Sequence, residues 1–214
     1  MNFWETRWHE GRIGFHLKEI NSYLIRFCNQ LLKNKTESVF VPFCGKTLDL
    51  CWLAERTNKV VGVELVEKAV EDFFEENKIK YITRKIDKFK IFQNLSIDIF
   101  HGDFFELSNK NTGQFEAIYD RASIVSIETY LRKKYVSHLM SFLAKRGRIL
   151  LITLEYDQSQ MSGPPFSVPV IEIKNLFSEF GSVELLETSN IIDDRLRDKG
   201  LEGILERVFK ITKC

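Results

Sequence analysis

Short apolar runs alternate with amphipathic stretches along most of this chain. Each run is apolar at consecutive positions, which is typical of a strand buried on both faces of a parallel sheet. The runs are 38–43, 59–65, 115–120 and 147–156. Stretches with apolar residues three or four positions apart, as in amphipathic helices, are 67–77, 129–144 and 170–180. The alternation predicts an α/β sandwich with a mostly parallel central sheet and helices on both faces.

Two regions depart from this alternation. Residues 79–100 hold only short strand-like pieces, among them 89–92 and 96–100. Near the C-terminus, 182–190 and 204–212 are strand candidates without a helix between them, so we expect an antiparallel pair at one edge of the sheet. Together these patterns predict a single domain over residues 1–214.

The segment before the first strand has two parts. Residues 17–33 have the apolar spacing of a helix, which we expect to cap the carboxyl ends of the strands. Residues 1–16 show no periodicity, yet they contain the aromatic side chains of Trp4, Trp8 and Phe15. These rings need burial, either by docking on the sheet edge or by forming a flap over a ligand. A flap of this kind would gain cation–π attraction from a positively charged ligand.

Composition narrows the class of protein. Lys and Arg number 31 against 30 Asp and Glu, and this balance argues against a nucleic-acid binder that relies on a general basic field. No run of 18 apolar residues occurs, and the N-terminus lacks the apolar region of a secretory signal. The four cysteines form no CxxC pair, so they are expected to be reduced thiols. We therefore expect a cytoplasmic protein without membrane or nucleic-acid partners.

The first strand-to-helix junction, VPFCGKTLDL, contains one glycine, Gly45. A phosphate-binding P-loop needs a second glycine at position 40, where Phe40 stands, and a GxGxxG dinucleotide motif is also absent. A lone glycine still lets the backbone approach a ligand closely, and a plain strand-to-helix turn is the alternative. A ligand here is therefore more easily a nucleoside than a nucleotide.

The second junction places Glu64 at the end of a buried strand, about 20 residues after the first loop. A carboxylate at this place accepts hydrogen bonds from both ribose hydroxyls of a bound nucleoside. Alternatively, the carboxylate could interact favourably with the positive N-terminal end of the following helix. Together, the two junctions describe a nucleoside site without phosphate chemistry, and S-adenosylmethionine has the matching shape.

Two further junctions carry charged residues. Asp103, after a strand candidate, could accept a hydrogen bond from an adenine amine beside an apolar wall made by Phe104, or it could simply stabilise a turn. Asp120 and Arg121 follow the run at 115–120, where a surface ion pair would contribute little stability. Alternatively, the planar Arg121 guanidinium could hold a carboxylate or another anion of the substrate.

Several segments together resemble the thiopurine S-methyltransferase family. They are FWETRWHEGRIGFH, VFVPFCGKTLDLCWLAER, VVGVEL, GDFF, AIYDRASIVSI, LEYDQSQMSGPPFSVP and KGLEGILERVFKI, which extend from Phe3 to Ile211. The resemblance implies a Rossmann-like class I methyltransferase fold that uses S-adenosylmethionine and needs no metal. It also implies methyl transfer to the sulfur of aromatic or heterocyclic thiols, a small-molecule substrate, and a monomer.

The resemblance also implies site residues. Those implied to contact the cofactor are Trp4, Trp8, Phe43, Glu64, Asp103, Phe104 and Arg121. Those implied to contact the substrate are Phe15, Arg121 and Arg195. Phe43 stands where the family usually has leucine, which keeps an apolar contact but adds bulk.

The expected reaction is an in-line displacement in which a thiolate attacks the methyl carbon of the cofactor. We expect Arg121 to stabilise the thiolate and Asp120 to orient Arg121. Methylation of selenium, tellurium or other small thiol nucleophiles, hydrogen sulfide included, is an open alternative. A non-catalytic module that binds S-adenosylmethionine is another. An NAD-dependent oxidoreductase is disfavoured because the glycine motif is missing.

Overall fold

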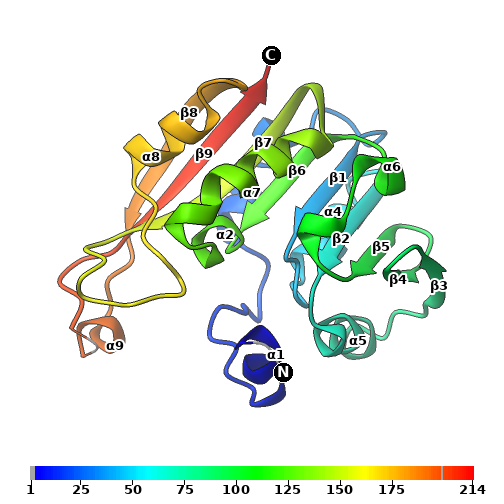
Figure 1. The fold of residues 1–214 in the computed structure, drawn as a ribbon, viewed down its shortest axis with the longest axis horizontal. Helices are drawn as coiled ribbons and strands as arrows, with labels where there is room; N and C mark the ends of the chain where they lie inside the picture. The colour runs from blue at the N-terminus through cyan, green and yellow to red at the C-terminus, as the bar shows by residue number, and fades with distance from the viewer. Residues whose placement is uncertain (1–2, 199) are drawn as a thin grey trace.

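In the computed structural model, which describes residues 3–198 and 200–214, nine strands form one sheet in the order β3-β4-β5-β2-β1-β6-β7-β9-β8 (Figure 1). The strands are β1 (Ser38–Pro42), β2 (Lys59–Glu64), β3 (Ile82–Ile86), β4 (Phe89–Gln93), β5 (Ile97–His101), β6 (Phe115–Arg121), β7 (Leu143–Glu155), β8 (Gly181–Asn190) and β9 (Leu205–Lys213). The α-helices are α1 (Phe3–His9), α2 (Ser22–Arg26), α3 (Cys28–Leu31), α4 (Asp49–Ala54), α5 (Glu67–Glu76), α6 (Asn109–Thr112), α7 (Thr129–Phe142), α8 (Val170–Phe177) and α9 (Asp194–Arg197). Two short 3-10 helices are η1 (Phe104–Glu106) and η2 (Ile124–Ser126).

The predicted sheet is confirmed. Strands β5, β2, β1, β6 and β7 pair in parallel, and their consecutive apolar residues are buried because helices cover both faces. Strand β9 runs antiparallel to β7, and β8 antiparallel to β9, as the C-terminal pattern predicts.

The opposite edge of the sheet is also antiparallel, because β4 pairs with β5 and β3 pairs with β4. The sequence pattern predicts only short strand-like pieces in this region. The sequence of β3, ITRKI, is exposed over most of its length, so burial imposes no apolar alternation on it.

Two apolar cores lie on the two faces of the sheet. On one face, α7 and α8 contribute Tyr135, Leu139 and Phe177, and Figure 1 shows both helices over the same side of the strands. On the other face, the helices α2 to α5 contribute Leu24, Leu50 and further residues. Among the described residues, no helix has the length and apolar character needed to cross a membrane.

The predicted single helix over 17–33 is wrong. The helical part begins at Ser22, because the Asn21 side chain accepts hydrogen bonds from Tyr23 N at 2.9 Å and Leu24 N at 3.2 Å. Helix α2 then ends at Phe27, and α3 follows directly and packs on β6 and β7. Arg148 Nε of β7 donates to Leu31 O at 2.9 Å. The helix pair therefore covers a face of the sheet and does not cap its carboxyl ends.

Residues 3–9 form helix α1, although their sequence shows no periodicity. This helix packs on α5, and Trp8 lies against Val66 and Ala69. In Figure 1, α1 lies apart from the sheet, on the side toward which the arrowheads of β1 and β6 point. The N-terminal segment therefore reaches the carboxyl ends of the strands, where ligands bind in sheets of this kind.

Candidate active site

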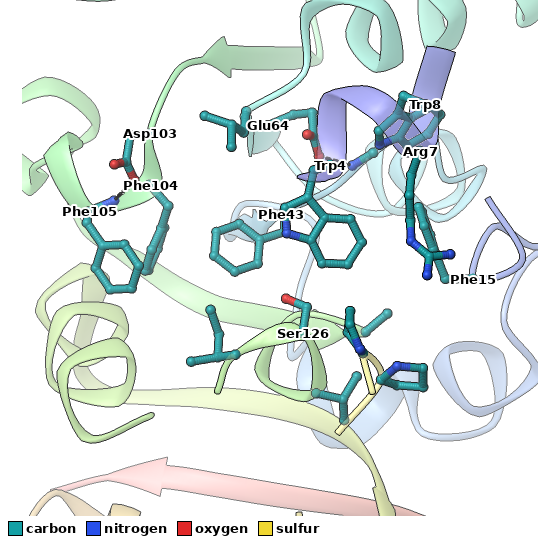
Figure 2. A pocket seen from close by; sticks show the side chains of 17 residues that line it. Trp4, Arg7, Trp8, Phe15, Phe43, Glu64, Asp103, Phe104, Phe105 and Ser126 are labelled. Carbon is teal, nitrogen blue, oxygen red and sulfur yellow. Dashed lines mark hydrogen bonds between the residues drawn. The ribbon is translucent and has the colours of Figure 1, made fainter. Parts of the chain in front are cut away.

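A cavity of about 340 Å³ lies where β1, β2, β5 and β6 end (Figure 2). The strand ends form its floor, α1 and its following loop form one wall, and the loop with Pro164 and Pro165 forms another. Its lining residues are Trp4, Arg7, Trp8, Phe15, Phe43, Gly45, Glu64, Leu65, Asp103, Phe104, Phe105, Ala122, Val125, Ser126, Ile127, Pro164 and Pro165. The structure thus brings together six of the seven residues implied to contact a cofactor, together with Phe15.

Glu64 ends β2 and is only 6% exposed. Its Oε2 accepts from Gly45 N at 2.9 Å, and its Oε1 accepts from Val66 N at 2.9 Å. Burial raises the pKa of this carboxyl, and the backbone N–H groups counteract part of that rise. Each carboxylate oxygen has a further lone pair, so the fixed group can accept hydrogen bonds from two ligand hydroxyls.

The turn after β1 brings the backbone close to α1. Phe43 has a φ of 45° and Gly45 a φ of 52°, so the chain passes twice through the left-handed region. A Cβ atom at Gly45 would lie 3.1 Å from Trp8 Cζ2. Glycine at this position therefore serves both the turn and the contact with the indole of Trp8.

Aromatic rings form two walls of the cavity. The Phe15 ring forms T-shaped contacts with Trp4 and with Trp8, each with 5.8 Å between ring centroids. Across from them, the Phe43 ring makes a T-shaped contact with the Phe104 ring, with 5.2 Å between ring centroids. The N-terminal rings pack against Val66 and Ala69 and also line the cavity, and a flap that closes over a ligand stays a prediction.

Asp103 has the turn role considered from the sequence, and its role toward an adenine amine stays a prediction. Its Oδ1 accepts from Phe105 N at 2.8 Å and so begins η1, which is the turn role. The exposed Asp103 side chain also lines the cavity next to Phe104, which is itself 2% exposed.

Arg121 lies at the end of β6 but lines a smaller adjoining cavity of about 40 Å³, together with His16 and Lys46. Its Nη1 donates to Phe15 O at 2.8 Å, which ties the N-terminal segment to the sheet.

Asp120 does not orient Arg121, and that prediction is wrong. Neighbouring residues of a strand point to opposite faces of the sheet. The Asp120 carboxylate is fully buried on the α7 face, where its Oδ2 accepts from Tyr135 Oη at 2.7 Å. Burial raises the pKa of Asp120 from 3.8 to about 6.

Comparison of the amino-acid sequence with known proteins identifies a family. The family model described as thiopurine S-methyltransferase matches residues 1–214. A thiopurine S-methyltransferase of Pseudomonas fluorescens (strain Pf0-1) is 42% identical, over 98% of this chain and 97% of that protein. One of Pseudomonas aeruginosa (strain LESB58) is 38% identical, over 99% of this chain and 98% of that protein.

The chain belongs to the thiopurine S-methyltransferase family. Among solved structures, a S-adenosylmethionine-dependent methyltransferase from Anabaena variabilis ATCC 29413 has a TM-score of 0.65 and 15% identity, over 99% of this chain and 93% of that one. The chain therefore has the predicted methyltransferase fold, and family and fold together support S-adenosylmethionine-dependent methyl transfer.

Sequence reasoning missed part of the cavity wall in this family member. Arg7 lies within FWETRW, Ser126 within AIYDRASIVSI, and Pro164 and Pro165 within the GPPF segment, so all four belong to segments that carry the resemblance. The sequence identifies these segments, but which of their side chains line the cavity depends on tertiary packing.

Two further expectations concern the substrate side and metal binding. Arg195 falls within α9, but its side chain lies outside the described residues, so its place near the substrate stays a prediction. Among the described residues, no group of three or more His, Cys, Asp or Glu could hold a metal ion. That the protein needs no metal also stays a prediction.

The buried Asp120 should make folding stability depend on pH. A carboxyl whose pKa is higher in the folded state contributes stability at acidic pH that is lost as the pH rises through its folded pKa. At about 1.4 kcal/mol per pKa unit, the rise from 3.8 to about 6 corresponds to about 3 kcal/mol. The unfolding free energy of the wild type, relative to Asp120→Asn, should fall by about this amount as the pH rises through this range. Urea denaturation across a pH series measures it.

The control is Asp157→Asn at an exposed turn. Hydrogen bonds from Ser159 lower the pKa of the Asp157 carboxyl, so its contribution to stability has the opposite sign. A difference between wild type and Asp120→Asn that stays constant with pH would show that Asp120 is ionised alike in both states.

Proposed function

We propose that this protein transfers the methyl group of S-adenosylmethionine to the sulfur of aromatic or heterocyclic thiols. The observation that carries the proposal is the buried Glu64 carboxylate, fixed by two backbone N–H groups at the floor of an aromatic-walled cavity. Membership of the thiopurine S-methyltransferase family supports the choice of sulfur as the acceptor atom.

The cavity suits an adenosyl group bound across the strand ends. The Glu64 carboxylate accepts hydrogen bonds from the ribose hydroxyls, while Asp103 and Phe104 receive the adenine. Phe43 contacts the cofactor between these two sites. Trp4 and Trp8 lie at the other wall, where an indole face attracts a sulfonium cation.

The cofactor supplies a methyl group bonded to positively charged sulfur. The acceptor thiolate attacks the methyl carbon from the side opposite that sulfur and forms a new sulfur–carbon bond. The old bond breaks, and its electron pair stays on the cofactor sulfur, which becomes a neutral thioether. The proton of the thiol has already gone to solvent. Both reacting atoms belong to ligands, so the protein acts mainly by positioning them.

The N-terminal segment, residues 1–16, acts in this proposal as a flap that excludes water from the two charged reactants. Arg121 supports the flap through its hydrogen bond to Phe15 O, and Phe15 faces the acceptor. The sequence-based role of Arg121 in stabilising the thiolate stays a prediction.

A direct assay tests the proposed function. Wild-type protein should bind S-adenosylhomocysteine in a calorimetric titration and show no heat with NAD. With S-adenosylmethionine, it should methylate thiophenol and a thiopurine, as measured by mass spectrometry of the products. Selenide and hydrogen sulfide are included to test the alternative acceptors. Binding of S-adenosylhomocysteine without methylation of any acceptor would instead identify a non-catalytic cofactor-binding module.

Exchange of Glu64 tests the cofactor position. Glu64→Ala should weaken S-adenosylhomocysteine binding by about 1.5–3 kcal/mol, the usual contribution of hydrogen bonds to a charged group. Titration calorimetry measures the dissociation constant, and Glu75→Ala on the exposed face of α5 is the control. An unchanged constant in Glu64→Ala would place the ribose elsewhere.

Exchange of Arg121 distinguishes support of the flap from stabilisation of the thiolate. Removal of the hydrogen bond to Phe15 O should lower kcat/KM in Arg121→Met roughly tenfold or more, about 1.4 kcal/mol, by the same factor at every pH. The segment before Phe15 should also become easier to cleave by protease. Arg121→Lys should recover only part of the activity, because lysine lacks the planar fork. A defect that shrinks as the acceptor thiol ionises would instead assign thiolate stabilisation to Arg121.

A further inference from the structure

Helix α1 carries one cationic side chain that lines the cavity and has no part in the proposed binding of the cofactor. Arg7 lines the cavity, and among the described lining residues it is the one cation. Figure 2 shows its guanidinium beside Phe15, on the opposite side of the cavity from Asp103, Phe104 and Phe105. Arg121 lines the smaller cavity and is bonded to Phe15 O, so the two arginines occupy different places.

The protein leaves this guanidinium poorly paired. Arg7 Nε is buried and has no hydrogen-bond partner among the described residues. Its Nη1 reaches Arg12 O only at 3.5 Å, at the outer limit of a hydrogen bond. The guanidinium carbon lies 4.8 Å from the centroid of the Phe3 ring, which orients the group but accepts none of its protons. A guanidinium has five N–H donors and an unpaired buried donor is costly, so a ligand that offers acceptor atoms would be stabilised here.

The charge of the cofactor limits what that ligand can be. With the adenosyl group placed on Glu64, Asp103 and Phe104, the cofactor's sulfonium is positive and is repelled by a neighbouring guanidinium. A negatively charged acceptor is attracted by both cations and is drawn toward the methyl group. We infer that Arg7 is an acceptor-binding residue that recognises a negative charge on an aromatic thiol. The charge is either the ionised sulfur itself or a carboxylate on the ring.

This inference rests on the proposed function for the position of the cofactor, but its test measures binding. Protein saturated with S-adenosylhomocysteine is titrated with para-mercaptobenzoate and with para-mercaptobenzamide, which differ in the charge of the ring substituent. Each titration is made below the thiol pKa and again above it, so that the carboxylate and the thiolate are examined separately. The proteins are wild type, Arg7→Met, Arg7→Lys and the control Arg12→Met, whose side chain is exposed in the same segment.

Below the thiol pKa, wild type should bind para-mercaptobenzoate more tightly than para-mercaptobenzamide. Alternatively, wild type should bind both ligands more tightly above the thiol pKa than below it. The first result identifies the ring carboxylate as the recognised charge, and the second identifies the thiolate. In Arg7→Met the advantage of the charged form should fall roughly tenfold or more, the loss expected for a charge-assisted hydrogen bond. Arg7→Lys should retain part of it, and Arg12→Met all of it.

Two results would overturn the inference. One is that Arg7→Met keeps the wild-type preference for the charged form, or that wild type shows no such preference at either pH. The other is a loss of S-adenosylhomocysteine affinity in Arg7→Met as large as the loss of acceptor affinity, which would assign Arg7 to the cofactor's own carboxylate. An unchanged melting temperature with S-adenosylhomocysteine bound shows that the variants are folded. Anion binding through Arg7 without methyl transfer would contradict the proposed function and support this inference.

Discussion

The arrangement of this site depends on one buried carboxylate held between two loops. Glu64 ends β2, and it accepts one backbone hydrogen bond from the turn after β1 and one from the turn after β2. A charged group removed from water is costly unless such donors surround it. The two bonds therefore fix both the carboxylate and the loops, and the cavity floor takes its shape from them.

The contacts around Gly45 extend this constraint to the N-terminal segment. Gly45 N donates to Glu64, and the same glycine leaves room for Trp8. Trp8 in turn packs with Phe15, whose carbonyl accepts the hydrogen bond from Arg121. These contacts attach the N-terminal wall of the cavity to the ends of β2 and β6. Such an attachment can hold a flap closed over a ligand while leaving α1 free of the main core.

The polar groups that hold the strand ends carry a cost in stability. Asp120 is buried among Tyr135 and the backbone after β6, and its pKa is raised because burial disfavours its charge. Phe43 and Ala122, which follow β1 and β6, both have positive φ angles of 45° and 65°. Backbone strain of this kind is commonly concentrated where a loop must present a surface to a ligand. Here both residues line the cavity, so the strain lies at the site itself.

The sequence by itself determined the order and type of the central elements, because burial on both faces leaves consecutive apolar residues at each parallel strand. It also determined that Glu64 and Gly45 are candidate site residues, since local patterns place Glu64 at the end of one strand and Gly45 in the turn after another. It did not determine β3, whose exposed residues are under no burial constraint, or the start of α2, which depends on the Asn21 cap.

Only the tertiary structure decided which charged side chains meet. Asp120 and Arg121 are neighbours in sequence but point to opposite faces of the sheet, so they serve different parts of the molecule. Arg7 and the Phe104 wall are far apart in sequence, yet they border the same cavity because α1 packs on α5 beside the strand ends. Sequence patterns report which face of an element is buried. The partner across a cavity is fixed by how elements distant in the chain pack together.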